Sequence, residues 1–355
     1  MFQSAILTGG LFAFSYFLTR MLIPLAFKFG LLDLPDGRKK HDGAIPLVGG
    51  ISIYIALVVW CATFTTLPDN IITVGIICGL VTLTGLIDDR HPMPARHRLL
   101  FQLLAGAAIG GVGGLALENL GNLLGFGDIN VSYFSIPLTA LSIAGLCNAF
   151  NMIDGIDGLA SGLGLIALCG LYFAVKDTAT VDETRVLHFF CVCLVVFMLF
   201  NLTINPFAKL KHKIFLGDAG SMFLGVSIAT ALIYFSQGDE PDISIATALW
   251  LVAIPFFDMC STIMRRILKG IHPFTADRTH IHHILQRAGL TRHQALIPII
   301  TTSILFAIIG ILLSNLPHFL SFAIFLITYG FYFHFTVRHA FQTSKYLAKL
   351  LPLRK

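Results

Sequence analysis

Residues 148–158 read NAFNMIDGIDG and place two asparagines and two aspartates in one short stretch, with a glycine after each aspartate. The residues on both sides are mostly apolar. Polar groups this dense at the mouth of an apolar segment are costly unless they bind something, so they indicate a functional site. The glycines allow the backbone to come close to a ligand. We therefore expect this stretch to form one wall of a metal and phosphate site at a membrane surface.

The composition of the chain is typical of a polytopic membrane protein. Of its 355 residues, 56% are hydrophobic and 12% are charged, whereas a soluble protein carries about 25% charged residues. Apolar runs of about 18 to 25 residues recur, each long enough to cross a bilayer, and a water-soluble helical core would not hide so many. The predicted fold class is therefore all-α, with one integral membrane domain over residues 1–355. We expect about eleven transmembrane helices, at residues 3–27, 48–67, 71–87, 99–117, 132–150, 159–175, 186–204, 221–236, 245–264, 295–313 and 319–337.

The distribution of basic residues predicts the direction in which the chain crosses the membrane. Most of the 24 lysines and arginines lie in loops on one face or in the C-terminal tail, whereas Lys176 and Arg185 lie on the other face. The positive-inside rule makes the basic face cytoplasmic. The N-terminus is then outside and the C-terminus is in the cytoplasm. The unusual polar clusters all fall on the cytoplasmic face, where they can form one active site; they are residues 38–50, 88–98, 148–157, 205–221 and 265–283.

The adjacent acids Asp88 and Asp89 end the third predicted span. Two neighbouring carboxylates beside apolar surface repel each other, and a divalent cation or nearby bases would relieve that repulsion. Arg90, Arg96 and Arg98 follow at once. The pair therefore indicates a site that handles magnesium or phosphate, and the alternative is an acidic helix end paired with these arginines.

Four oxygen-bearing side chains follow one another at intervals of three residues: Asn148, Asn151, Asp154 and Asp157. On a continuing helix they would share a face. Oxygen ligands suit Mg²⁺, which usually keeps some waters and shares the phosphates of the substrate. The alternative is a helix end with polar packing between helices.

Residues 209–221 read KLKHKIFLGDAGS and combine three lysines with the start of the eighth predicted span. Backbone N–H groups at a helix start attract anions, and Asp218 there could hold a metal ion that bridges a phosphate. Simple N-capping is the alternative for Asp218 and Ser221. The lysines could serve only to orient the chain in the membrane.

The loop after the ninth predicted span reads RRILKGIHPFTADRTHIHH and contains Arg265, His280, His282 and His283. The HxHH pattern lacks the glutamate of a helical zinc protease, so we favour recognition of a phosphate or of sugar hydroxyls over a zinc site. A purely structural loop is the third interpretation. Residues 38–50, RKKHDGAIPLVGG, include Lys39, which could hold a phosphate, although a basic segment next to a membrane needs no such role.

Together, these motifs resemble the polyprenyl-phosphate N-acetylhexosamine-1-phosphate transferase family. RKKHDGAIPLVGG, LIDDR, NAFNMIDGIDG and FLGDAGS are similar to the family's motifs and stand in its order over nearly the whole chain. DRTHIHH resembles the bacterial branch that transfers N-acetylglucosamine 1-phosphate to undecaprenyl phosphate and so starts enterobacterial common antigen and many O-antigen chains. The resemblance implies a reaction of UDP-N-acetylglucosamine with undecaprenyl phosphate at the bacterial inner membrane, with release of UMP. It implies Mg²⁺ as the cofactor, with Mn²⁺ able to substitute.

The resemblance also implies roles for individual residues. Asp218 would bind the metal with Asn151 as its partner. The catalytic group would be Asp88, Asp89, Asp154 and Asp157, which position the lipid phosphate, the nucleotide or the metal shell. Substrate-binding residues would be Lys39, Asn148, Asn205, Arg265, His280, His282 and His283.

Three other functions remain open on the sequence. A phospho-N-acetylmuramoyl-pentapeptide transferase of peptidoglycan synthesis belongs to the same family but carries a different histidine loop. A secondary transporter would place its coupling acids near the bilayer centre, and a zinc-dependent hydrolase would need zinc. The expected partners are membrane lipids and the two substrates, with no nucleic acid. Since members of the family often form homodimers, a homodimer is also an expectation, although no residue in the sequence shows one.

Overall fold

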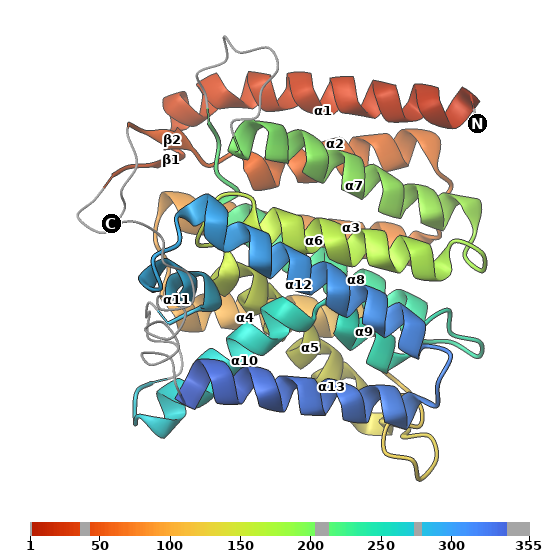
Figure 1. Ribbon diagram of the computed structural model, residues 1–355. Helices are drawn as coiled ribbons and strands as arrows, with labels where there is room; N and C mark the ends of the chain where they lie inside the picture. The colour runs from red at the N-terminus through yellow and green to blue at the C-terminus, as the bar shows by residue number, and fades with distance from the viewer. Residues whose placement is uncertain (1, 36–42, 203–212, 273–278, 339–355) are drawn as a thin grey trace.

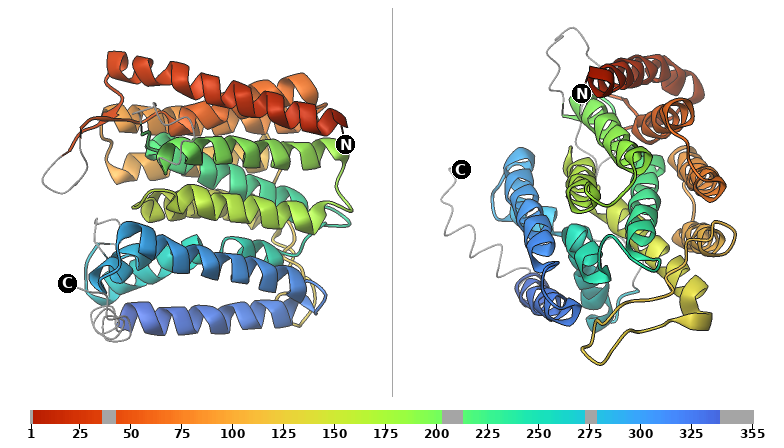
Figure 2. Two further views of the ribbon diagram at one scale, coloured as in Figure 1. Left: turned by 45° about the horizontal axis from the view of Figure 1, so that its top comes forward. Right: turned by 90° about the vertical axis from the view of Figure 1, so that its right-hand side faces the viewer.

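The computed structural model describes residues 2–35, 43–202, 213–272 and 279–338 (Figure 1). Within these ranges the regular structure is helical, apart from one small antiparallel sheet, in which Leu32 pairs with Pro46 and Asp33 with Ile45, and one isolated bridge between Asn119 and Asn130. The helices run roughly parallel to one another in a single bundle (Figure 2). The elements are α1 (Phe2–Phe29), β1 (Leu32–Asp33), β2 (Ile45–Pro46), α2 (Gly49–Phe64), α3 (Asp69–Arg90), α4 (Ala95–Gly111), η1 (Ser132–Phe134), α5 (Ser135–Ile153), α6 (Leu159–Val175), α7 (Val181–Asn201), α8 (Gly217–Ser236), α9 (Ile245–Leu251), α10 (Ala253–Leu268), α11 (Ile281–Arg287), α12 (Arg292–Leu313), α13 (His318–Phe333) and the π-helical η2 (His334–Arg338).

The predicted all-α polytopic membrane fold is confirmed. In the described part of the chain, seven helices are long and apolar enough to cross a membrane, and the bent pair α9–α10 raises the number to eight. The seven are α1, α3, α5, α7, α8, α12 and α13. The apolar helices α2 and α6 are shorter than this limit, and α4 has 17 residues. Each of the eleven predicted spans overlaps a helix or the bent pair, and the number that crosses the bilayer stays a prediction.

The predicted span at residues 245–264 is wrong as a single helix. It consists of α9 and α10, which meet at an angle of 82°. Pro255 explains the break, because its ring would clash with the carbonyl group four residues earlier, and it has no N–H to donate there. That carbonyl belongs to Leu251, the last residue of α9.

Helix α8 is the centre of the bundle, because 83% of its most apolar window is buried. Small residues let its neighbours come close. Gly50 of α2 and Gly85 of α3 lie against the backbone at residues 219 and 220 of α8, and neither has room for a Cβ atom. Gly225 of α8 lies in the same way against the backbone of Cys147 in α5. Close backbone contact at small residues is the usual means of packing helices within a membrane.

The segment before α8 also joins α2 to the centre. Gly49 and Gly50 at the start of α2 donate backbone hydrogen bonds of 3.0 Å to the carbonyls of Phe215 and Leu216. Phe215 in turn donates to the carbonyl of Pro46 in β2, at 2.9 Å. In Figure 1, β1, β2 and α11 lie at one end of the bundle and the start of α1 lies at the other. The motif that leads into α2 and the motif that leads into α8 therefore meet through backbone hydrogen bonds at the end of the bundle that carries β1, β2 and α11.

The predicted topology can be tested with single cysteines at the two ends of the bundle. The Asp177 side chain, in the loop between α6 and α7, is 83% exposed, and Arg96 is exposed at the start of α4. We expect Asp177→Cys to react with a membrane-impermeant maleimide in intact cells, and Arg96→Cys to react only after permeabilisation. The seven native cysteines are buried or partly buried, which keeps background labelling low. Protection of the cysteine at position 177 in intact cells would overturn the topology.

Candidate active site

The start of α8 is held by a carboxylate from another helix. Asp89, near the end of α3, accepts hydrogen bonds from the backbone N–H groups of Asp218 at 2.7 Å and Ala219 at 3.1 Å. Leu216, the N-cap residue of α8, has an apolar side chain that cannot accept these hydrogen bonds. Gly217 has a φ of +74° and its Cα faces the Asp89 carboxylate with no room for a Cβ atom. Asp89 therefore positions Asp218 through the backbone, and the alternative of self-capping by Asp218 is not what the structure shows.

Asp88 and Asp218 share one arginine. Nη1 of Arg98 lies 2.7 Å from Oδ2 of Asp88 and 3.3 Å from Oδ2 of Asp218. Asp88 is 4% exposed, and its Oδ1 also accepts the backbone N–H of Met93, at 2.5 Å. A buried carboxylate needs such partners. Asp88 is therefore paired with one of the arginines that follow it, and Arg98 links it to the start of α8.

Asn151 completes the surroundings of Asp218. Its Nδ2 donates to Oδ1 of Asp218 at 2.5 Å and to Oγ of Ser221 at 3.0 Å. Asn148 lies one helical turn earlier and is not hydrogen-bonded to Asp218. Its Nδ2 donates to Oε1 of Gln102 in α4 at 2.6 Å and to a backbone carbonyl of its own helix. Asn151 thus lies beside the acid expected to bind a metal, and Asn148 is tied to α4.

The predicted helical stripe of four oxygen-bearing side chains is wrong in its second half. Helix α5 ends at Ile153, so Asp154 and Asp157 lie in the loop that leads to α6. The loop turns through Gly158, whose φ is +75° and whose N–H donates to Oδ1 of Asn201 at 2.7 Å. A left-handed glycine backbone does not continue a helix.

The two loop aspartates have different surroundings. Asp157 forms a salt bridge with Nζ of Lys213, at 2.5 Å. Asp154 is exposed at the surface, and its pKa is nevertheless raised, because the surrounding protein desolvates it and the carboxylates of Asp218 and Asp157 repel its charge. Solvent on its open side weakens both effects. Asp154 is thus the acid of the loop that would gain most from a bound cation.

The imidazole ring of His282 in α11 contacts the loop that carries Asp154 and Asp157. His282 is 1% exposed, and its Nε2 edge lies against Gly155, where a Cβ atom would have no room. Burial lowers the pKa of His282 to about 3, with the adjacent His283 as a second cause, so the ring is neutral at physiological pH. Glycine at position 155 is therefore required for contact between α11 and the aspartate loop.

His280 is oriented by an acid that the sequence analysis missed. Its Nδ1 lies 2.7 Å from Oδ2 of Asp258 in α10, and both side chains are almost completely buried. Oδ1 of Asp258 accepts the N–H of Ile281 at 2.8 Å and the hydroxyl of Tyr332 at 3.2 Å. Arg265, also buried, donates to Thr262 at 3.2 Å and to Thr279. A lone aspartate inside an apolar span was the signal in the sequence.

The structure brings most of the predicted residues to one end of the bundle. Asp89 and Asn151 contact Asp218 directly, and Arg98 links Asp88 to Asp218. Gly155 links the aspartate loop to the histidines. Lys39 and Asn205 lie outside the described residues. Across the described ranges, no three or more His, Cys, Asp or Glu side chains are grouped as a ready-made metal site.

Comparison with known proteins identifies the family of this chain. Residues 70–236, from α3 to the end of α8, match the family described as glycosyl transferase family 4. The chain is 32% identical over 345 residues to the undecaprenyl-phosphate alpha-N-acetylglucosaminyl 1-phosphate transferase of Yersinia pestis. The aligned residues make up 96% of this chain and 93% of that protein. The chain belongs to glycosyl transferase family 4.

Two further relatives in the family carry the same name. The protein of Escherichia coli strain K12 is 34% identical over 333 residues, which is 92% of this chain and 89% of the relative. The protein of Haemophilus influenzae is 33% identical over 338 residues, or 94% of each chain. Family membership makes the chain a phosphoglycosyl transferase, and the site geometry at the start of α8 lies within the matched region.

The role of Asp258 can be tested by separating its two side-chain contacts. Asp258→Asn keeps the shape but removes the charge that faces Nδ1 of His280, so we expect kcat/KM to fall by about tenfold or more, the usual size for a charged hydrogen bond. Tyr332→Phe removes the other hydrogen bond to Asp258 and leaves His280 untouched, so its kcat/KM should stay within about threefold. Equal effects of the two substitutions would make Asp258 a structural residue only.

Proposed function

We propose that the protein transfers N-acetylglucosamine 1-phosphate from UDP-N-acetylglucosamine to undecaprenyl phosphate, with release of UMP. The observation that carries the proposal is the cluster of Asp88, Asn151 and Asp218 around Arg98 at the start of α8. For each of the three relatives named for this reaction, the alignment with this chain covers 89% or more of the relative's length. The product would start O-antigen or enterobacterial common antigen chains.

The reaction brings a lipid phosphate against a diphosphate, so the site must overcome repulsion between anions. The residues proposed to hold Mg²⁺ are Asp218, with Asn151 beside it, and the ion would neutralise charge on the diphosphate when bound. Arg98 Nη1 is within reach of both Asp88 and Asp218, and this shared contact keeps the two acids together before any ligand arrives. Mn²⁺ is expected to replace Mg²⁺ because it also accepts oxygen ligands.

The remaining residues would bind and orient the two substrates. Lys213, which pairs with Asp157, is a cation next to the aspartate loop and suits a phosphate. His280 would present Nε2 to the sugar or diphosphate, because Asp258 holds its Nδ1. The attacking lipid phosphate is already ionised near neutral pH, so the site needs positioning and charge stabilisation more than a strong base.

The proposal includes a place in the cell. The basic end of the bundle would face the cytoplasm of a bacterial inner membrane, with about eleven spans, the N-terminus outside and the C-terminus inside. UDP-sugars are then reached from the cytoplasm, and the lipid substrate is reached from the bilayer. A homodimer is proposed on the family resemblance alone.

A transfer assay on the purified protein in detergent tests the proposal. With undecaprenyl phosphate and labelled UDP-N-acetylglucosamine, we expect lipid-linked label that disappears when a chelator removes Mg²⁺ and returns with Mn²⁺. Label from UDP-muramoyl-pentapeptide instead would move the protein to the peptidoglycan branch. No transfer from either donor by well-folded protein would contradict the proposed chemistry and favour the transporter interpretation.

Asp218→Asn tests the metal role within the same assay. We expect turnover to fall by about 100-fold or more, because even partners of metal ligands typically contribute about 10- to 100-fold. Asp177→Asn is the matched control, since it makes the same chemical change at the opposite, exposed end of the bundle. Near-normal turnover of a monodisperse Asp218→Asn protein would remove Asp218 from the metal site.

A further inference from the structure

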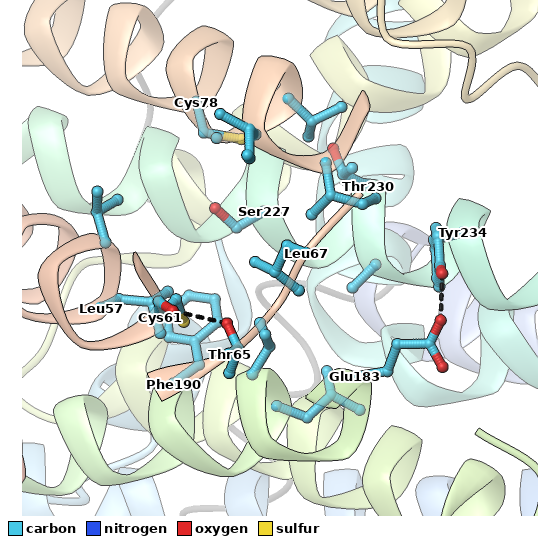
Figure 3. Close-up of a pocket in the computed structure, with 18 of the residues that line it drawn as sticks. Leu57, Cys61, Thr65, Leu67, Cys78, Glu183, Phe190, Ser227, Thr230 and Tyr234 are labelled. Atoms are coloured by element: carbon cyan, nitrogen blue, oxygen red, sulfur yellow. Dashed lines mark hydrogen bonds between the residues drawn. The ribbon is translucent and has the colours of Figure 1, made fainter. Parts of the chain in front are cut away.

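A cavity lies between α2, α3, α7 and α8, away from the aspartates of the candidate active site. Its volume is about 640 Å³, within the usual range of small-molecule sites. Figure 3 shows its wall, with Leu57 and Cys61 from α2, Leu67 from the loop before α3, and Phe190 from α7. Along α3 the lining ends at Cys78, and Asp88 lies ten residues further on, which is about 15 Å along a helix. The cavity is therefore separate from the candidate active site.

The polar atoms in the wall need no ligand. The hydroxyls of Thr65 and Thr230 donate to backbone carbonyls of their own helices, at 2.7 Å each. The hydroxyl of Tyr234 donates to Glu183, as the dashed line in Figure 3 shows. A cavity whose polar groups are already satisfied holds water poorly, and an empty space of this size forfeits many packing contacts. Its chemistry suits a hydrocarbon occupant.

The cavity opens sideways toward the bilayer. Three of its lining residues are also exposed on the outer surface of the bundle: Val58 at 39%, Ile72 at 52% and Ile76 at 60%. They belong to α2 and α3, which border the mouth. At the far end the loop between these helices is fixed, because Asp182 accepts both the N–H and the hydroxyl of Thr66, at 2.9 and 2.7 Å. A lipid chain can therefore enter between α2 and α3, and the fixed loop closes the cavity at the end of the bundle remote from the active site.

The polar end of the cavity carries a negative charge. Glu183 lines it and accepts hydrogen bonds from the Thr180 N–H, at 2.7 Å, and from Tyr234. Neither donor is a cation. The neighbouring Asp182 is neutralised by Arg185, at 2.8 Å, so Glu183 sets the sign of the charge at this rim. An ammonium headgroup is attracted there, and an anionic headgroup is repelled.

We infer that this cavity is a binding site for one acyl chain of a zwitterionic phospholipid of the phosphatidylethanolamine type, drawn from the leaflet on the side opposite the active site. The chain fills the space between α2 and α3, and the ammonium group lies near Glu183. The bound lipid would brace α2, whose other end contacts the segment before α8. The inference does not depend on which sugar the active site transfers.

Gly75 offers a clean way to fill the cavity. It lines the wall, and a Cβ atom at this position meets nothing within 4 Å. Gly75→Leu therefore adds its bulk at a lining position where the first added atom has free space. Gly330→Leu on α13 is the matched control, because a Cβ atom there is also free of neighbours within 4 Å and the residue does not line the cavity. Ala62→Leu, which also changes an exposed lining residue, provides a second filling variant.

The measurement is native mass spectrometry of the full-length protein after delipidation and titration with 1-palmitoyl-2-oleoyl-phosphatidylethanolamine or the matching phosphatidylglycerol. We expect one tightly bound phosphatidylethanolamine on the wild type and on Gly330→Leu, and at least about tenfold weaker binding to Gly75→Leu and Ala62→Leu. Glu183→Gln, which preserves the helix cap, should lose the preference for phosphatidylethanolamine over phosphatidylglycerol. Equal binding to the wild type and both filling variants would overturn the inference.

A second readout distinguishes the phospholipid from the tail of the acceptor substrate. If the cavity holds a phospholipid, Gly75→Leu leaves the KM for undecaprenyl phosphate unchanged while phospholipid binding is lost. A KM raised about tenfold or more in Gly75→Leu, with Gly330→Leu normal, would assign the cavity to the substrate tail and overturn the phospholipid assignment. Loss of transfer by the wild type itself would contradict the proposed function and leave the lipid titration unaffected.

Discussion

The Asp89 carboxylate accepts hydrogen bonds from the N–H groups of Asp218 and Ala219 at the start of α8, and the rest of the site depends on this interaction. Helix α8 is the most buried candidate span, and its start carries Asp218. A helix start that is enclosed by protein leaves N–H groups without partners unless a side chain supplies acceptors. Asp89 supplies two of them from α3. The negative charge of Asp89 also interacts favourably with the positive end of the α8 helix dipole. The contact that packs α3 against α8 therefore also fixes the position of Asp218.

The glycines around this contact have a related purpose. Gly50 and Gly85 bring α2 and α3 against the first turn of α8 with no room for side chains. Gly155 does the same for His282 and the aspartate loop. Each close approach joins two motifs that are far apart in sequence. The short motifs of this chain are therefore packing devices as well as carriers of chemistry, which explains why glycine and aspartate occur together in them.

Much of the architecture could be predicted from the sequence, because apolar runs of membrane length are a direct physical signal. The polar clusters were predicted to meet, and the structure places Asp88, Asn151 and Asp218 within one network. Contacts between distant residues were not predictable. The pairing of Asp258 with His280 and the capping of α8 by Asp89 depend on helix packing that no spacing reveals.

Local breaks in the helices were missed for a different reason. Asp154 and Asp157 have helical spacing, but the tertiary contacts of Gly155 and Gly158 favour a loop there. The bend before α10 had a local signal in Pro255, but the apolar run continues through it and hid the break. Hydrophobicity predicts that a segment is buried in the membrane, and it does not predict that the segment is straight.

We propose that the start of α8 forms a single divalent-cation site shared with the nucleotide sugar. Electron paramagnetic resonance of Mn²⁺ added to the purified protein tests it most directly, because Mn²⁺ is paramagnetic and takes the same oxygen ligands. We expect one bound Mn²⁺ per chain, a spectrum altered by UDP-N-acetylglucosamine, and loss of the bound ion when Asp89→Ala releases the start of α8. Unchanged Mn²⁺ binding in a folded Asp89→Ala protein would contradict a cation site at the start of α8.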